Sequence, residues 1–260
     1  MIDVPDDIDS VLVDSEAAFK VIWQSATGDT PIVRAVSTGM RADRLSWVFI
    51  SGYQGAIRLA FDAIPEKEWW SFAVSEDKTG QLPGVELTDG LLSGTKTWVA
   101  ACDHVDGVIV TAAGHYYLVP RDAEVAQFER YGASSFLPDM STGKVTLKNA
   151  DAGNAIEMKI DFRLAEPVAL MAASAGYLWR EASRLGERSL LRRSEAIVGR
   201  LAELDQIDLR AISAIYSEVA EQGKVCAGVA ANRGDASVND WQQNGRLLSM
   251  YRKALAEQAG

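Results

Sequence analysis

The apolar residues of this chain repeat with a helical period at both ends and with a period of two in the middle. Helical spacing runs from about residue 9 to 64 and returns from Glu166 onward. Between about 69 and 162, short alternating runs are separated by glycines and aspartates, as in antiparallel strands. This order predicts an α+β protein with N-terminal helices, a central antiparallel β barrel or sandwich, and a C-terminal helical bundle. The expected boundaries are 1–66, 67–163 and 164–260.

Two helices are expected in the N-terminal part. In "DSVLVDSEAAFKVIWQSA", Ser10 is a candidate N-cap for the first helix. Gly28 and Pro31 in "TGDTP" then interrupt the helical pattern. The stretch "RADRLSWVFISGYQGAIRLAFDAIP" is apolar on almost every side, which is typical of a helix buried among others, and Pro65 ends it.

The middle part predicts strands and the last part predicts long helices. "GVIVTAAGHYYLVP" indicates a hairpin with an Ala-Gly-His turn, and "GKVTLKNA" and "AIEMKIDF" alternate like two further strands. Near the C-terminus, Gly223 is expected to interrupt one long helix, and a last helix is expected over 238–257. The buried face of that long helix is predicted to carry Leu204, Ile207, Ile212, Ile215 and Val219.

Composition excludes several classes of protein. The 260 residues carry a net charge of −10 and a pI near 4.8, which disfavours binding to a phosphate backbone. Cys102 and Cys226 are too few for a disulfide framework. No apolar run approaches the roughly 18 residues needed to span a membrane. The acidic start "MIDVPDDIDSV" is unlike a signal peptide, so a cytoplasmic protein with no nucleic-acid or membrane partner is expected.

Two motifs of the β block resemble those of the acyl-CoA dehydrogenase family. "FAVSEDKTG" at 72–80 is similar to the family's strand ending in Thr-Glu-Pro-x-x-Gly-Ser-Asp, with Ser75, Glu76 and Gly80 at matching positions. "GTKTWVAA" at 94–101 is similar to Gly-x-Lys-x-Trp-Ile-Ser/Thr. The resemblance implies the family's architecture, a helical domain, a β domain and a C-terminal helical bundle, which agrees with the order of periods.

The resemblance also implies FAD as cofactor, with Ser75, Gly80, Lys96 and Trp98 as cofactor-binding residues. A tryptophan offers a large polarisable face to the flat flavin, and a serine hydroxyl can bond the edge of its ring. The alternatives stay open from the residues alone. Trp98 also fits a core position of a strand, and Lys96 fits a solvated strand position or the partner of a nearby acid.

The sequence departs from the family motifs at three positions. Ala100 occupies the place from which the family often supplies a second hydroxyl, and Gln81 and Leu82 stand where the family has Ser-Asp. The glycine-rich Phe-Gly-Gly signature near a flavin phosphate is also missing from the sequence. Half of the family's flavin motif is therefore present.

The candidate catalytic base is Glu166. Most of the family takes a glutamate from a late Tyr-Glu-Gly segment, which this sequence lacks, but a minority places it at the start of the first C-terminal helix. "AEPVALMAASAG" resembles that helix start, with Gly176 ten residues after Glu166. The other interpretation is that Glu166 and Pro167 simply open a helix.

The other polar clusters in the sequence give weaker indications of a functional site. "CDHVD" holds three kinds of metal ligand, but consecutive residues point in different directions and a polar hairpin end explains them. With only His104 and His115 available, a Ser-His-Asp hydrolase is not supported. The basic run "WREASRLGERSLLRRSEAIVGR" fits a solvated helix face, a subunit contact or an anion site.

Two functions follow from the resemblance. The first is an oxidoreductase acting on the CH–CH group of an acyl-CoA in fatty acid metabolism, where Glu166 removes a proton and flavin N5 takes a hydride. Its partners would be the acyl-CoA, an electron-transfer acceptor and a second subunit, in a homodimer or a hetero-oligomer with a related chain. The alternative is a degenerate, non-catalytic family member that acts as a binding or scaffolding subunit.

Overall fold

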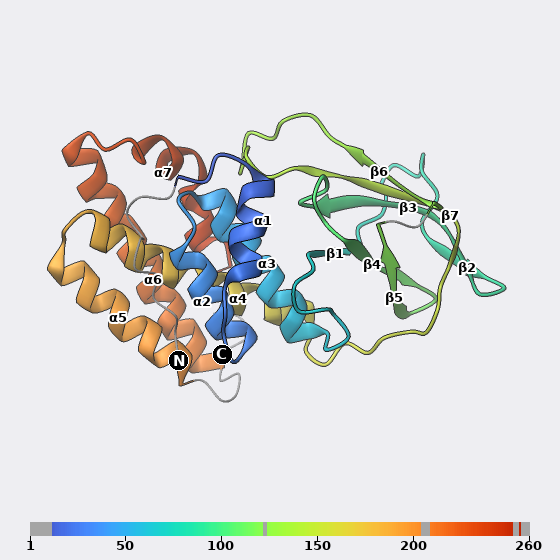
Figure 1. The fold of residues 1–260 in the computed structure, drawn as a ribbon, viewed down its shortest axis with the longest axis horizontal. Coiled ribbons are helices and arrows are strands. Elements are labelled where there is room, and N and C mark those ends of the chain that lie inside the picture. The colour runs from blue at the N-terminus through green and yellow to red at the C-terminus, as the bar shows by residue number, and fades with distance from the viewer. Residues whose placement is uncertain (1–11, 122–123, 204–208, 252–254, 256–260) are drawn as a thin grey trace.

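A computed structural model shows the helices and the β-sheets at opposite ends of the molecule (Figure 1). It describes residues 12–121, 124–203, 209–251 and 255. The helices α1 and α3 lie between the sheets and the outer helices α5 and α6 (Figure 1). The period changes of the sequence therefore correspond to regions that are separated in space.

The element bounds follow the order expected from the sequence. The helices are α1 (Glu16–Ser25), α2 (Pro31–Met40), α3 (Leu45–Ala60), α4 (Phe162–Arg184), α5 (Arg188–Ala202), α6 (Leu209–Arg233), α7 (Val238–Asn244) and the 3₁₀ turn η1 (Gly245–Ser249). The strands are β1 (Trp70–Ala73), β2 (Glu86–Thr88), β3 (Leu91–Ala100), β4 (Gly107–Ala112), β5 (His115–Pro120), β6 (Ala126–Arg130) and β7 (Thr142–Asp151).

The N-terminal region has three helices rather than two. Ser15 caps α1 by accepting the Ala18 N–H at 3.2 Å, and the predicted cap Ser10 lies outside the described residues. Pro31 was predicted only to interrupt the helical pattern. It is also the first residue of α2, directly after Thr30, whose hydroxyl caps this helix. A proline in the first turn loses no helical hydrogen bond, which explains how a breaker signal can begin a helix.

Two open sheets form a sandwich-like β region, so the sandwich alternative is the one the fold adopts. One sheet has the order β1-β4-β5 and the other β2-β3-β7-β6, and no barrel closes among the described strands. The prediction of purely antiparallel pairing is wrong for one pair, because β1 runs parallel to β4. That pairing follows from the topology, since the β2–β3 excursion lies between these two strands in the chain.

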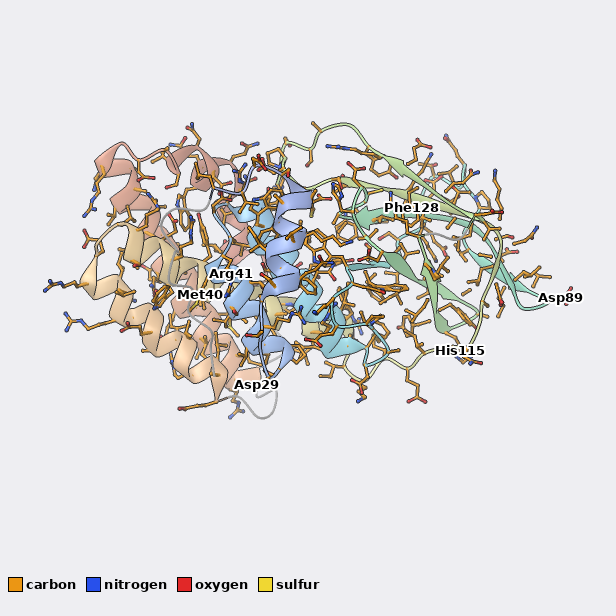
Figure 2. All side chains as sticks on the ribbon, in the orientation of Figure 1. Asp29, Met40, Arg41, Asp89, His115 and Phe128 are labelled. Atoms are coloured by element: carbon orange, nitrogen blue, oxygen red, sulfur yellow. The ribbon has the colours of Figure 1, made fainter. Side chains whose placement is uncertain are left out.

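The predicted hairpin is confirmed, and one predicted strand is wrong. β4 and β5 pair through a two-residue turn, Ala113–Gly114, in which both residues have positive φ. Figure 2 shows Asp89 and His115 at the tips of the two hairpins, at the end of the molecule away from the helices. "AIEMKIDF" contributes only an isolated bridge from Ile156 to Tyr116, because this segment crosses from the sheet to α4.

The C-terminal helices pack around α4. Asp161 caps α4 by accepting the Arg163 N–H, so Glu166 lies in the second turn and does not open the helix. The alternative interpretation of Glu166 as a helix-opening residue is therefore wrong. Ile212, Ile215 and Val219 are buried on α6 as predicted, while Leu204 and Ile207 lie outside the described residues.

The break predicted at Gly223 does not occur. α6 continues to Arg233, and a Cβ at Gly223 would lie 2.6 Å from a Leu248 methyl group, so this glycine makes room for η1. The last predicted helix is shorter than expected: α7 ends at Asn244, followed by η1, and the predicted remainder includes residues 252–254 and 256–257, outside the described part.

The seam between α4 and the N-terminal helices is formed by small residues. A Cβ at Gly39 of α2 would lie 2.1 Å from the Ala173 carbonyl oxygen, and one at Gly176 of α4 would lie 2.1 Å from the Val36 carbonyl oxygen. Real Cβ atoms do not approach other atoms so closely, so the backbones meet because side chains are absent. This seam holds the N-terminal and C-terminal helices together.

Within the described residues, no helix is both long and apolar enough to span a membrane.

Replacing Gly176 by Ala should destabilise the protein strongly. The added methyl would overlap the Val36 carbonyl, and we expect the free energy of unfolding to fall by about 2–4 kcal/mol. The control is Gly228→Ala on the exposed face of α6, where no atom lies within 4 Å of the added Cβ and stability should rise by up to about 1 kcal/mol. Urea unfolding followed by circular dichroism measures both, and equal effects would refute close packing at the seam.

Candidate active site

A cavity of about 590 Å³ opens where the two sheets meet the first turns of α4. Its walls come from α3, the segment after β1, the strands β3, β4 and β5, and the start of α4. The lining residues are Tyr53, Phe72, Val74, Ser75, Trp98, Thr111, Tyr116, Met158, Asp161, Phe162, Arg163 and Glu166. Three of the five predicted site residues, Ser75, Trp98 and Glu166, therefore line one cavity although they come from distant parts of the chain.

Glu166 lies in the second turn of α4 and faces this cavity. Burial raises its pKa from the ordinary value to about 7, because the carboxylate loses solvation. A hydrogen bond from the Tyr251 hydroxyl opposes this shift by stabilising the charged form. The pKa of Tyr251 is itself raised above its ordinary range by burial and by the nearby Glu166, so this phenol remains a proton donor. The carboxyl group of Glu166 thus titrates near neutral pH.

Trp98 is half-buried and belongs to a wall of aromatic rings. Its ring meets those of Tyr53 and Phe49 edge-to-face, with centroids 5.6 and 6.4 Å apart. Both neighbours lie on α3, so the indole is held from the helical side and also lines the cavity. Trp98 therefore both packs against core aromatic rings and lines the cavity, and its contact with a cofactor stays a prediction.

Lys96 is buried behind the cavity rather than in its lining. Its side chain is 1% exposed, and Nζ donates to Glu76 Oε1 at 2.5 Å and to Thr111 Oγ1 at 3.1 Å. The expectation of a solvated lysine is wrong, and the expectation of an acid partner is confirmed. Because Thr111 lines the cavity, Lys96 acts on the site through the hydroxyl it holds. A direct cofactor contact by Lys96 stays a prediction.

Ser75 lines the cavity, and Gly80 lies beyond it. The Ser75 carbonyl oxygen accepts the Thr97 N–H at 2.8 Å, which ties the segment after β1 to β3. Gly80 is exposed in the following turn with φ +75°, a conformation that favours glycine. The Asp77 carboxylate organises this turn by accepting backbone N–H groups from Thr79, Gln81 and Leu82, which lower its pKa to about 2. A cofactor contact by Gly80 stays a prediction.

Most residues of the site were not predicted from the sequence, and Tyr53, Thr111 and Tyr251 illustrate why. Tyr53 lies in a helix that is apolar on almost every side, so nothing marked it as a cavity residue. Thr111 is part of an ordinary alternating strand. Tyr251 reaches Glu166 from a segment 85 positions away in the sequence, a contact that only the fold creates. The alternating pattern of β4 could have indicated that Thr111 faces the cavity. No local signal identified Tyr53 or Tyr251 as site residues.

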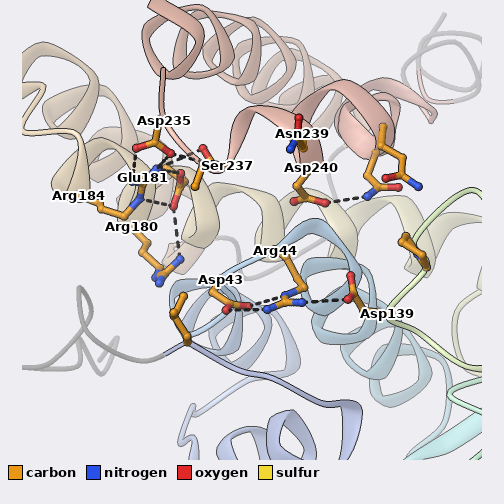
Figure 3. A pocket seen from close by; sticks show the side chains of 15 residues that line it. Asp43, Arg44, Asp139, Arg180, Glu181, Arg184, Asp235, Ser237, Asn239 and Asp240 are labelled. Atoms are coloured by element: carbon orange, nitrogen blue, oxygen red, sulfur yellow. Dashed lines mark hydrogen bonds and ion pairs between the residues drawn. The ribbon is translucent and has the colours of Figure 1, made fainter. Parts of the chain in front are cut away.

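A second cavity, of about 370 Å³, lies between α4, α7 and the turn before α3 (Figure 3). Most of its charged side chains form ion pairs with one another. Arg184 bonds both Glu181 and Asp235, and Arg44 bonds Asp43 and Asp139. These pairs fasten the helices together, and none of the five predicted site residues lines this cavity.

The "CDHVD" segment lies elsewhere, and no cluster of three metal-ligating side chains exists among the described residues.

Comparison with known proteins finds similarity in structure and none in sequence. No protein-family model matches the sequence, and no curated protein matches it. Among solved structures, PigA in its FAD complex aligns at a TM-score of 0.66 with 11% identity, covering 94% of this chain and 88% of PigA. Butyryl-CoA dehydrogenase from Megasphaera elsdenii aligns at a TM-score of 0.64 with 10% identity, covering 95% and 89%.

The chain has the acyl-CoA dehydrogenase fold. FkbI, described as serving biosynthesis of a methoxymalonyl polyketide extender unit, aligns with it at a TM-score of 0.64 and 14% identity, over 91% of this chain and 87% of FkbI. The resemblance inferred from two short motifs is therefore confirmed at the level of the fold. In this example of the acyl-CoA dehydrogenase fold, the cavity that holds Glu166, Trp98 and Ser75 is the candidate active site.

The ion pair between buried Lys96 and half-exposed Glu76 gives a prediction about stability. Glu76→Gln leaves the ammonium of Lys96 buried without its anion, and we expect a loss of about 1–3 kcal/mol. Lys96→Met removes the buried charge and keeps the volume, so its cost should stay within about 1 kcal/mol. Urea titrations at one pH compare the two variants. The opposite ranking would show that the ammonium is better solvated than its 1% exposure indicates.

The raised pKa of Glu166 predicts a specific dependence of stability on pH. The folded state holds this proton more tightly than the unfolded state, so its contribution is complete below about pH 4.5 and is lost as the pH rises through about 7. Glu166→Gln lacks this loss. Relative to wild type it should gain up to about 3 kcal/mol between pH 4.5 and 8, at about 1.4 kcal/mol per pKa unit. A pH-independent difference in urea unfolding would contradict the burial of the carboxylate.

Proposed function

We propose that this protein is an FAD-dependent oxidoreductase that dehydrogenates the Cα–Cβ bond of an acyl thioester. One observation carries the proposal: Glu166, a carboxyl group with a pKa near 7, shares a cavity with Trp98 and Ser75. The same three residues were selected from the sequence by their match to family motifs. Chance would rarely bring three such positions to one cavity.

The residues of the cavity fit a flavin. Trp98 offers an aromatic surface that is already fixed by Tyr53 and Phe49, so little conformational freedom would be lost on stacking. The hydroxyl groups of Ser75 and Thr111 suit the polar edge of an isoalloxazine ring. PigA, which aligns over nearly the whole chain, is described as an FAD complex. When bound, the flavin would supply the acceptor for the two electrons that leave the substrate.

Glu166 would act as the base that removes the proton from the carbon next to the thioester carbonyl. A base is most effective when its pKa lies near the working pH, and burial brings this carboxyl group to about 7. Tyr251 donates to the carboxylate and would hold it in one orientation before the substrate arrives. Asp161 and Arg163, which pair with each other at the exposed rim, leave Glu166 as the cavity's buried acid.

The substrate and partners belong to the same proposal. Butyryl-CoA dehydrogenase is named for a CoA thioester, which supports an acyl-CoA as substrate. An electron-transfer acceptor would reoxidise the flavin, and a homodimer or a hetero-oligomer with a related subunit would complete the assembly. Sedimentation of the purified protein at several concentrations would distinguish these assemblies.

Purified protein supplied with FAD and freed of excess should show the visible bands of an oxidised flavin at close to one per chain. Glu166→Gln should keep these bands and lose roughly a hundredfold or more in turnover of an acyl-CoA. In the wild type, turnover should rise with pH through about 7, because the deprotonated carboxylate is the active form.

Glu16 supplies the matched control. It is another buried glutamate with a pKa near 7, but its carboxylate accepts the N–H and hydroxyl of Ser141, outside the cavity. Glu16→Gln should therefore leave turnover unchanged. A colourless protein that takes up no FAD would refute the proposal and favour a non-catalytic binding subunit.

A further inference from the structure

We propose that the candidate active site accepts a compact acyl group and excludes long linear chains, with Tyr53 as the residue that sets the limit. The inference rests on the proposed function and adds the class of substrate to it. It follows from what closes the cavity at its inner end, which the sequence motifs do not reveal. The relevant residues belong to α3, α4 and the edge of the β1-β4-β5 sheet.

The inner end of the cavity is closed by aromatic rings. The ring centroids of Phe72 and Phe162 lie 4.4 Å apart, and those of Tyr53 and Phe162 lie 5.7 Å apart. On its other side, Tyr53 stacks on Phe49 at 5.5 Å. At such spacings the rings touch, and no alkyl chain passes between them.

Hydrogen bonds fix Tyr53 in this position. Its hydroxyl accepts the Phe72 N–H at 2.9 Å and lies 3.4 Å from the Ser71 hydroxyl. The side chain is 2% exposed. Swinging the ring aside to admit a longer substrate would break these bonds and leave the partly buried N–H of Phe72 unsatisfied. Tyr53 is therefore a fixed wall of the cavity.

Behind Tyr53 the helices leave no channel. A Cβ at Gly52 would lie 2.6 Å from the Leu170 Cα, and one at Gly55 would lie 3.3 Å from the Ala169 Cβ. α3 and α4 thus touch backbone to backbone one turn beyond Glu166. A long chain directed between these helices would have to separate them, against the packing that holds the helical region together.

The side toward β5 is closed as well. Phe61 and Tyr116 have ring centroids 5.4 Å apart, and Phe72 lies within 6 Å of both. The remaining side carries the exposed residues Ser75 and Asp161. A thioester would enter from this side, with its carrier in solvent and its acyl end against Tyr53. The whole cavity measures about 590 Å³, and the flavin ring would share it with the acyl group.

The experiment compares acyl-CoA thioesters of 4, 8 and 16 carbons with the full chain, by turnover and by binding of non-oxidisable thioether analogues in calorimetry. Wild type should favour the shortest over the longest by roughly tenfold or more in both readouts. Tyr53→Ala should shift this ratio toward the longer chains by roughly tenfold. Phe162→Leu is a smaller change in the same wall and should shift the chain-length ratio in the same direction. This second variant keeps the test valid if Tyr53→Ala does not fold.

Tyr177→Ala is the matched control. Tyr177 is a fully buried tyrosine of α4 that packs on Trp241 at 5.5 Å and does not line the cavity. Its replacement creates a similar cavity elsewhere and should lower stability without changing the chain-length ratio.

The outcomes separate the two proposals. Binding that favours the shortest analogue without any turnover supports the compact site and refutes the dehydrogenase. Turnover that favours 16 carbons, or a ratio unchanged in both wall variants, overturns the compact site and leaves the dehydrogenase standing. Absence of binding by every analogue overturns the inference about the acyl group.

Discussion

The close contact of α4 with α2 and α3 is the constraint on which the rest of the structure depends. Gly39, Gly52 and Gly176 let the helix backbones touch, and this contact brings the first turns of α4 against the sheets. A larger residue in the seam would move α4 outward by the width of a methyl group or more. The cavity would then lose its wall at Phe162 and its carboxyl group together. Stability and site geometry therefore have one origin.

Burial decides what the polar groups of the β region can do. Lys96 is buried, and its ammonium donates one hydrogen bond to Glu76 and one to the Thr111 hydroxyl, so it acts on the cavity only through Thr111. Glu166 loses solvent without gaining a cation among the described residues, and its pKa rises as a result. The charge of Lys96 is compensated by Glu76, whereas the carboxylate of Glu166 has a hydrogen bond from Tyr251 and no cation among the described residues, which is the setting that the proposed proton transfer requires.

The sequence predicted the order of elements and part of the site, because both leave local signals. Changes of period located the helices and strands, and the match around Trp98 and Glu166 located two walls of one cavity. The parallel pairing of β1 and β4 and the contact of Tyr251 with Glu166 depend on how distant segments meet, which no local pattern encodes. At Gly223 a local signal was misleading. The glycine predicted a helix break, but it makes room for the Leu248 side chain within a continuous helix.

The register of α4 links these observations. Asp161 fixes where the helix begins, and residues four apart then lie on one face. Along that face Phe162 closes the cavity, Glu166 presents its carboxyl group, and Leu170 meets Gly52 in the seam. A shift of one residue would turn this face by about 100° and remove the acid from the cavity while the helix itself stayed intact. The helix cap at Asp161 therefore determines the position of Glu166 as directly as any contact that the carboxyl group makes itself.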